Sequence, residues 1–151
     1  IGSTRRSDEF DEPVVGSTEE TSAEVLKAIE EHPDDTASLR RKCHRLRNLG
    51  HNDAGAMKIV VTAMKGHLND ERLLAAGFGA VWGVAASRDE NKLEAVDSGA
   101  ISTILTALRV HQGDVNLIQW AVGSLSSLAF APGVKAFVAN DNGVSLLLST
   151  Q

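Results

Sequence analysis

Six basic side chains lie within one short stretch of the chain: Arg40, Arg41, Lys42, His44, Arg45 and Arg47. In a helix, Arg40, His44 and Arg47 share one face, and residue 51, a histidine, continues it. Guanidinium groups form paired hydrogen bonds with carboxylates and phosphates. The stretch therefore predicts a site for an acidic or phosphorylated segment of a partner. Two alternatives are a solvated end of the solenoid and pairing with the acidic leader over residues 1–17.

Cys43 stands next to His44, a pairing that could activate a nucleophile. However, Cys43 has helical spacing from Leu39 and Leu46, which places it on an apolar stripe and favours a buried structural thiol. The glycines at 77, 79 and 83 fall inside a predicted helix, so they do not form a phosphate-binding loop between a strand and a helix. We predict no catalytic residues.

Three histidines, His32, His67 and His111, occupy equivalent positions before three turns. A shared metal ion would require them to converge, and packed helices lie about 10 Å apart, which keeps successive copies separate. We expect the histidines to interact instead with carbonyl groups at helix C-termini. The sequence therefore predicts no metal and no cofactor.

The two tryptophans, Trp82 and Trp120, lie on helices that also carry glycines at 79, 83 and 123. These glycines remove side chains from the surface between neighbouring helices. In one interpretation the indoles border a shallow apolar pocket that acts as a binding hot spot. In the other, both rings fill the gaps that the glycines leave between repeats.

Composition places the chain among globular proteins, with 151 residues and 42% hydrophobic residues. A net charge of −5 and the lack of aromatic residues among the basic ones argue against nucleic acid as a partner. The longest apolar run, residues 75–86, is too short to cross a bilayer, and no signal peptide is recognisable, so we expect no membrane partner. A single cysteine allows no internal disulfide and favours a reducing compartment, the cytoplasm or the nucleus.

Helical periodicity continues from about residue 18 to the end of the chain, after a flexible acidic leader over residues 1–17. Thr18 or Thr21 would cap the first helix, Asp34 or Asp35 the second, and Asn69 or Asp70 a later one. The first expected helix carries Val25, Leu26 and Ile29 and ends at residues 31–33, and the second carries residues 39–49. The third covers about residues 54–66, and a short one that begins at Asp89 contains Leu93 and Val96. The other expected helices include residues 73–84, 104–108, 117–128 and 134–139, and a further helix begins at residues 144–148.

Residues 55–98 and 99–142 follow the same plan, and a shift of 44 aligns His67 with His111 and Asp70 with Asp114. The first unit, residues 18–54, aligns at a shift of 35 and lacks the short helix. A further unit begins at residue 143, and the chain stops inside it at Gln151, as a fragment of a longer protein would. Each unit has an apolar stripe that it can bury only by stacking on its neighbours. We expect Leu125, at the centre of the most complete unit, to lie on this buried stripe. We therefore predict an all-α, right-handed α-solenoid in which one helix of each unit lines a concave groove.

A 44-residue unit with one short and two longer helices resembles the armadillo repeat, with the HEAT repeat as a neighbouring family. The resemblance rests on the corner glycines Gly55, Gly99 and Gly143 and on the run from Ala121 through Leu125 and Leu128 to Ala129. It covers about residues 20 to 151 and implies a stack of three-helix repeats.

One departure from the family narrows the function. Armadillo proteins that bind nuclear localisation peptides carry a tryptophan and, four residues later, an asparagine on the groove-lining helix. The equivalent pairs here are His44 with Asn48, Gly79 with Gly83, and Gly123 with Ser127, and only Asn48 fits. An import-receptor role is therefore not expected. The predicted partner-binding groove residues are Arg40, His44, Arg47, Asn48, Gly79, Trp82, Gly83, Trp120, Gly123 and Ser127.

The resemblance implies a non-catalytic scaffold that binds a protein or peptide in its concave groove. From the basic and indole side chains we expect the partner to combine acidic and apolar residues. The alternatives are a regulatory arm of a larger multidomain enzyme, such as a kinase or a ubiquitin ligase, and a cytoskeletal building block. The sequence makes no prediction about the oligomeric state.

Overall fold

The computed structural model describes residues 20–49 and 55–130. This part of the chain is all-α, as predicted, with seven helices and no strand. The helices are α1 (Ser22–Glu31), α2 (Thr36–Leu49), α3 (Ala56–Lys65), α4 (Glu71–Ser87), α5 (Asp89–Asp97), α6 (Ala100–Val110) and α7 (Val115–Ala129). The predicted leader, the helix at 134–139, the unit from 143, His51 and Gly143 lie outside the described residues.

Local signals begin the helices, three of them at predicted positions and one, Asp114, at a position that was not predicted as a cap. Side-chain oxygens of Thr21, Asp35, Asp70 and Asp114 each accept a hydrogen bond from the backbone N–H three residues later, at 3.0 to 3.2 Å. The corner glycines Gly55 and Gly99 precede α3 and α6 with φ of 87° and 90°. Glycine adopts this left-handed conformation without the steric cost of a Cβ atom, so these positions turn the chain between units.

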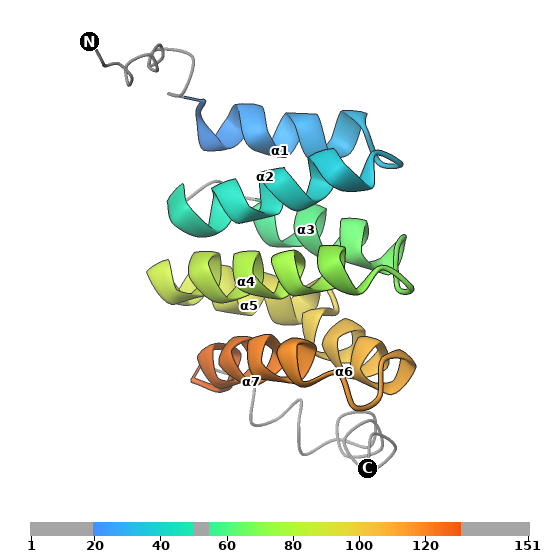
Figure 1. The fold of residues 1–151 in the computed structure, drawn as a ribbon. Helices are drawn as coiled ribbons and strands as arrows, with labels where there is room; N and C mark the ends of the chain where they lie inside the picture. The colour runs from blue at the N-terminus through green and yellow to red at the C-terminus, as the bar shows by residue number, and fades with distance from the viewer. Residues whose placement is uncertain (1–19, 50–54, 131–151) are drawn as a thin grey trace, which may run out of the picture.

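Three helix hairpins stack on one another, α1 with α2, α3 with α4, and α6 with α7 (Figure 1). In one layer α4 packs between α2 and α7, and in the other α3 packs between α1 and α6. Helix α5 contacts α3, α4, α6 and α7. Only residues 50–55 separate α2 from α3, so the first hairpin has no room for a counterpart of α5.

The core runs between the two layers, with Phe78 among its largest fully buried side chains. In α7 the buried stripe is Leu117, Ala121, Ser124 and Leu128, so the expectation that Leu125 is central to it is wrong: Leu125 is only partly buried. The Ser124 hydroxyl compensates for its burial by donating to the Phe78 carbonyl oxygen at 2.6 Å.

In α5 the buried residues are not Leu93 and Val96, its two larger apolar side chains. Asn91 and Ala95 are buried, whereas Leu93 is exposed and Val96 is partly buried. The Asn91 side-chain amide donates to the Val84 carbonyl oxygen at 3.0 Å, near the end of α4. This bond ties α5 to α4 and satisfies a buried polar group.

Two of the equivalent histidines link one hairpin to the next. His67 Nε2 lies 2.6 Å from the carbonyl oxygen of Pro33, and His111 Nε2 lies 2.8 Å from that of Leu68. Pro33 and Leu68 are themselves equivalent at the shift of 35 residues. The histidines therefore bond to turns of the preceding hairpin, which corrects the expectation of helix C-terminal carbonyls. His32, in the first hairpin, is exposed.

Candidate interaction surface

The basic residues of α2 divide between different faces of the helix. Arg40 and Arg47 are partly buried, and His44 is largely exposed. Desolvation of the covered part of its ring, followed by the positive charges of Arg47 and Arg40, lowers the pKa of His44 below its usual value of 6.5. The three residues lie at positions i, i+4 and i+7 of α2, on the shared face that the helical spacing predicts.

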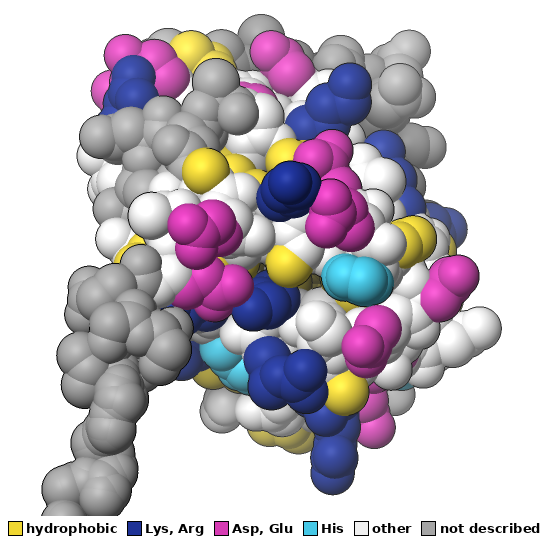
Figure 2. All heavy atoms as spheres, turned by 90° about the horizontal axis from the view of Figure 1, so that it is seen from above, with side chains coloured by type: hydrophobic (Ala, Val, Ile, Leu, Met, Phe, Trp, Pro, Cys, Tyr) yellow, Lys and Arg dark blue, Asp and Glu magenta, His cyan; other side chains and the backbone are white. Residues whose placement is uncertain are grey.

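The neighbouring basic residues point elsewhere. Lys42 Nζ lies 2.7 Å from Glu20 Oε2, and Arg41 is exposed. Glu20 lies directly before α1 and after the predicted leader, so pairing of the basic residues with the leader itself lies outside the described residues. Viewed from the α1–α2 end, the surface carries both basic and acidic side chains, with histidine among them (Figure 2).

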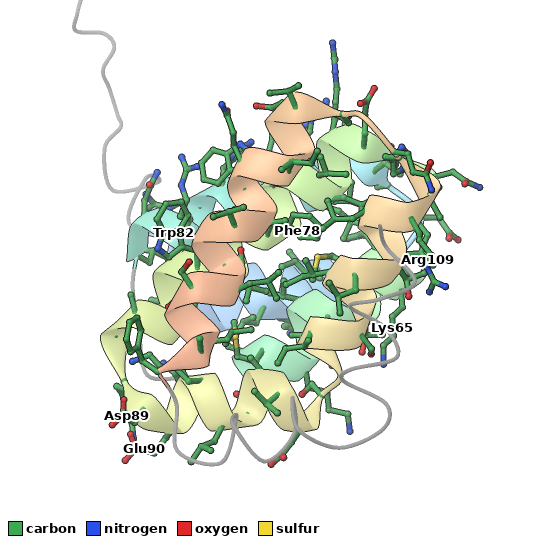
Figure 3. All side chains as sticks on the ribbon, turned by 90° about the horizontal axis from the view of Figure 1, so that it is seen from below. Lys65, Phe78, Trp82, Asp89, Glu90 and Arg109 are labelled. Carbon is green, nitrogen blue, oxygen red and sulfur yellow. The ribbon has the colours of Figure 1, made fainter. Side chains whose placement is uncertain are left out.

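Arg47, Trp120 and Trp82 form a connected cluster across three helices, α2, α7 and α4. Arg47 Cζ lies 5.1 Å from the centroid of the Trp120 ring, within the range of a cation–π interaction. The two indoles meet edge to face, with centroids 5.9 Å apart and planes inclined by 73°. Trp82 lies at the edge of the helix stack in Figure 3 and keeps 42% of its surface exposed. The structure thus joins basic and aromatic groups on the α2–α4–α7 layer.

The glycines of this layer are covered by the same side chains. A Cβ atom at Gly123 would lie 2.4 Å from Trp82 Cζ3, and one at Gly79 would lie 3.2 Å from Arg47 Cδ. At Gly83 it would lie 2.8 Å from the Arg47 carbonyl oxygen. The rings and Arg47 therefore fill the spaces beside the glycines, and these positions do not form the bare floor of a pocket. The packing therefore agrees with the second interpretation of the tryptophans, in which both rings fill the gaps that the glycines leave between repeats.

The remaining predicted groove residues are Asn48, which is exposed, and Ser127, which is partly buried. Neither takes part in the cation–aromatic contacts described above. The structure therefore brings Arg40, His44 and Arg47 together on α2 and connects Arg47 to the two indoles.

Cys43 is fully buried, and burial raises the pKa of its thiol to about 12. At neutral pH the thiolate, which is the nucleophilic form, is therefore strongly disfavoured. This confirms the prediction of a structural thiol. Among residues 20–49 and 55–130, no three His, Cys, Asp or Glu side chains are grouped closely enough to hold a metal ion.

A cavity of about 680 Å³ between α1 and α3 was not anticipated from the sequence. Its walls include Ile29, Glu30, Pro33, Asp34, Lys58, Ile59, Ala63 and His67. At the equivalent place between α3 and α6, Lys65 occupies the position of Glu30 and its Nζ donates to the Ser98 carbonyl oxygen at 3.2 Å.

A pair of neighbouring carboxyl groups was also missed, those of Glu71, in the first turn of α4, and Asp114, the N-cap of α7. A hydrogen bond between them requires that one of them is protonated, and this bond and the charge of Asp114 raise the pKa of Glu71. The same bond and the Leu117 N–H lower the pKa of Asp114. The two residues belong to adjacent repeats, so only the stacking brings them together.

The described part of the chain is thus a stack of helical hairpins with a cation–aromatic cluster on one layer. Comparison of the sequence and structure with protein-family models, with curated proteins and with solved structures finds no match in any of the three. None of the seven helices combines the length and the apolar character needed to cross a membrane.

Proposed function

We propose that the protein is a non-catalytic interaction scaffold of the armadillo type. Its ligand is an extended protein segment that combines acidic and apolar residues, and the segment binds along the α2–α4–α7 layer. The observation that carries this proposal is the cluster of Arg47, Trp120 and Trp82, which continues into Arg40 and His44. The repeated histidine links and corner glycines support the armadillo resemblance.

The charge on α2 selects an acidic segment. Three basic groups gather here although the whole chain has a net charge of −5. Arg47 Cζ lies over the Trp120 ring at 5.1 Å, and a guanidinium group carries five N–H donors, more than this one contact uses. A carboxylate can accept from the remaining donors without displacing the indole. The charges would also raise the association rate and make it depend on salt.

The exposed part of Trp82 provides apolar contact area next to this charge. Indole rings are common binding hot spots because they desolvate a large rigid surface. Trp82 is held by its contact with Gly123 and with Trp120, so it loses little conformational freedom when a partner binds. An apolar residue next to an acidic one in the partner would meet both features together.

Tryptophan emission tests this proposal directly, because the chain contains two tryptophans and no tyrosine. The whole chain is titrated with three peptides of equal length, one alternating Glu and Leu, one alternating Glu and Ser, and one alternating Lys and Leu. We expect a saturable change in emission with the Glu–Leu peptide, weaker binding of Glu–Ser, and none of Lys–Leu. Equal binding of the Lys–Leu peptide, or no saturation with any peptide, would exclude the proposed ligand.

A further inference from the structure

Helix α7 carries an apolar stripe on a face that no described helix covers. The stripe consists of Val115, Ile118, Val122 and Leu125, spaced three, four and three residues apart. Ile118 is 41% exposed and Val122 is 58% exposed, while Leu125 is partly buried. Figure 3 views the end of the stack that is formed by α5, α6 and α7.

The same stripe is buried in both preceding hairpins. A shift of 44 residues takes Ile118, Val122 and Leu125 to Leu74, Phe78 and Val81 of α4. A further shift of 35 residues leads to Leu39, Cys43 and Leu46 of α2. All six of these residues are fully buried, in helices that pack against the next helix of the layer. The equivalent stripes of α2 and α4 therefore each form a contact with the next helix of the layer. Helix α7 carries the same stripe, and no described helix covers it.

The helix that covers each stripe brings small residues to the contact. Helix α4 has Gly79, Ala80 and Gly83 where α7 has Gly123, Ser124 and Ser127. These residues are small because the two backbones approach closely. A Cβ atom at Gly83 would lie 2.8 Å from the Arg47 carbonyl oxygen, and the Ser124 hydroxyl lies 2.6 Å from the Phe78 carbonyl oxygen. A leucine at either position would collide with backbone atoms of the helix beneath.

We propose that the apolar stripe of α7 is a docking surface for an amphipathic helix that presents Gly, Ala or Ser at positions i, i+1 and i+4. The proposal extends to a third site the geometry by which α4 covers α2 and α7 covers α4. It does not depend on the proposed function, because Trp120 and Gly123 lie on the side of α7 that faces α4, away from this stripe.

A second copy of the chain does not supply this helix by adding its first hairpin to the end of the stack. In α2 the positions equivalent to Gly79, Ala80 and Gly83 carry His44, Arg45 and Asn48. These side chains are too large for the close backbone approach, and burial against an apolar stripe would remove the charge of Arg45 from water. The helix that docks here therefore differs from α2 in carrying small residues at these three positions.

A peptide with the sequence of residues 114–130 serves as the probe, because α7 is itself a helix that covers such a stripe. The peptide carries Ile118→Gln and Val122→Gln to remove its own copy of the stripe, a fluorescent label, and a staple on its exposed face that holds it helical. Anisotropy is measured against the whole chain, and we expect saturable binding. Absence of saturation would overturn the proposal.

The matched control peptide adds Ser124→Leu. Leucine raises both hydrophobicity and helix propensity, so non-specific adhesion would strengthen binding. If the contact instead requires a small residue at this position, the Ser124→Leu peptide should bind at least about tenfold more weakly than the first peptide. Equal or tighter binding of the Ser124→Leu peptide would show that the stripe is merely adhesive and would contradict the proposed helix.

On the protein side, Val122→Asp should weaken binding of the first peptide by about tenfold or more. Val110→Asp is the control, because Val110 is also exposed but lies on α6 outside the stripe, and binding should stay within about twofold. Far-ultraviolet circular dichroism checks both variants, and Ile118→Lys replaces Val122→Asp if helicity falls. Unchanged binding by the stripe variant, or a wild-type dimer in sedimentation that this variant dissociates, would overturn the proposal.

Discussion

The indole of Trp82 occupies the space that a side chain at Gly123 would need, since a Cβ atom there would lie 2.4 Å from Trp82 Cζ3. Alanine normally favours a helix interior over glycine by about 1 kcal/mol. We nevertheless expect Gly123→Ala to lower the free energy of unfolding by about 1–3 kcal/mol, because a rigid ring must move. Urea denaturation measures the loss, and a shift of tryptophan emission to longer wavelength reports displacement of the indole.

Gly79→Ala is the control for that experiment. Its Cβ atom would lie 3.2 Å from Arg47 Cδ, in a flexible side chain that can move aside. We expect a smaller effect on stability than at Gly123. If Gly123→Ala stabilises the protein as much as helix propensity alone predicts, Trp82 does not lie where the structure places it.

The two leucines of α7 provide a second comparison. Leu128 is fully buried and Leu125 is partly buried. Leu128→Ala should lower the free energy of unfolding by about 2–5 kcal/mol, as core truncations do. Leu125→Ala should cost clearly less, because part of its side chain already contacts water. Urea denaturation of both variants measures which substitution lowers the free energy of unfolding more. A larger loss for Leu125→Ala would show that Leu125, and not Leu128, lies on the buried face of α7.

Local signals predicted the existence of all seven described helices and three of the residues that cap them, Thr21, Asp35 and Asp70. Asp70 and Asp114 cap helices through a backbone N–H only three residues away, and Gly55 and Gly99 turn the chain by their own φ angles. Such interactions depend on neighbours within one helical turn, so a short stretch of sequence is enough to anticipate them.

Features that depend on two helices could not be predicted in the same way. Burial of Ser124 instead of Leu125 depends on the Phe78 carbonyl, 46 residues earlier in the chain. The face shared by Arg40, His44 and Arg47 follows from periodicity within one helix and was predicted. The contact of Arg47 with Trp120 depends on how α2, α4 and α7 stack, and periodicity carries no information about that distance.

The histidine links predict a further stability difference. Since a carbonyl oxygen only accepts, His111 Nε2 must carry a proton and donate to Leu68. His111→Ala should lower the free energy of unfolding by about 0.5–1.5 kcal/mol, the usual contribution of one hydrogen bond. His32→Ala changes the equivalent exposed position and should have little effect. Urea denaturation measures the free energy of unfolding of both variants. Equal losses would show that the hydrogen bond between His111 and Leu68 does not stabilise the stack.

His44 should titrate below 6.5, because partial burial and the charges of Arg47 and Arg40 lower its pKa. The unfolded state then takes up the proton first, so the His44 contribution to stability decreases as the pH falls below 6.5. An acidic partner would raise this pKa, and its binding should strengthen as the pH falls through the same range. Nuclear magnetic resonance titration of the His44 ring measures the pKa, which Arg40→Glu should raise. A titration at or above 6.5 in the wild type would contradict the proximity of the two arginines.

The most direct measurement of the proposed binding face compares Arg40→Glu with Arg41→Glu. The two variants change the net charge equally and lie next to each other in α2, but only Arg40 shares the face of His44 and Arg47. Titration with the Glu–Leu peptide, followed by tryptophan emission, should show about tenfold weaker binding for Arg40→Glu and a reduced dependence on salt. Arg41→Glu should bind within about twofold of the wild type. Equal weakening in both variants would show that only net charge matters, and unchanged binding in Arg40→Glu would place the interface elsewhere.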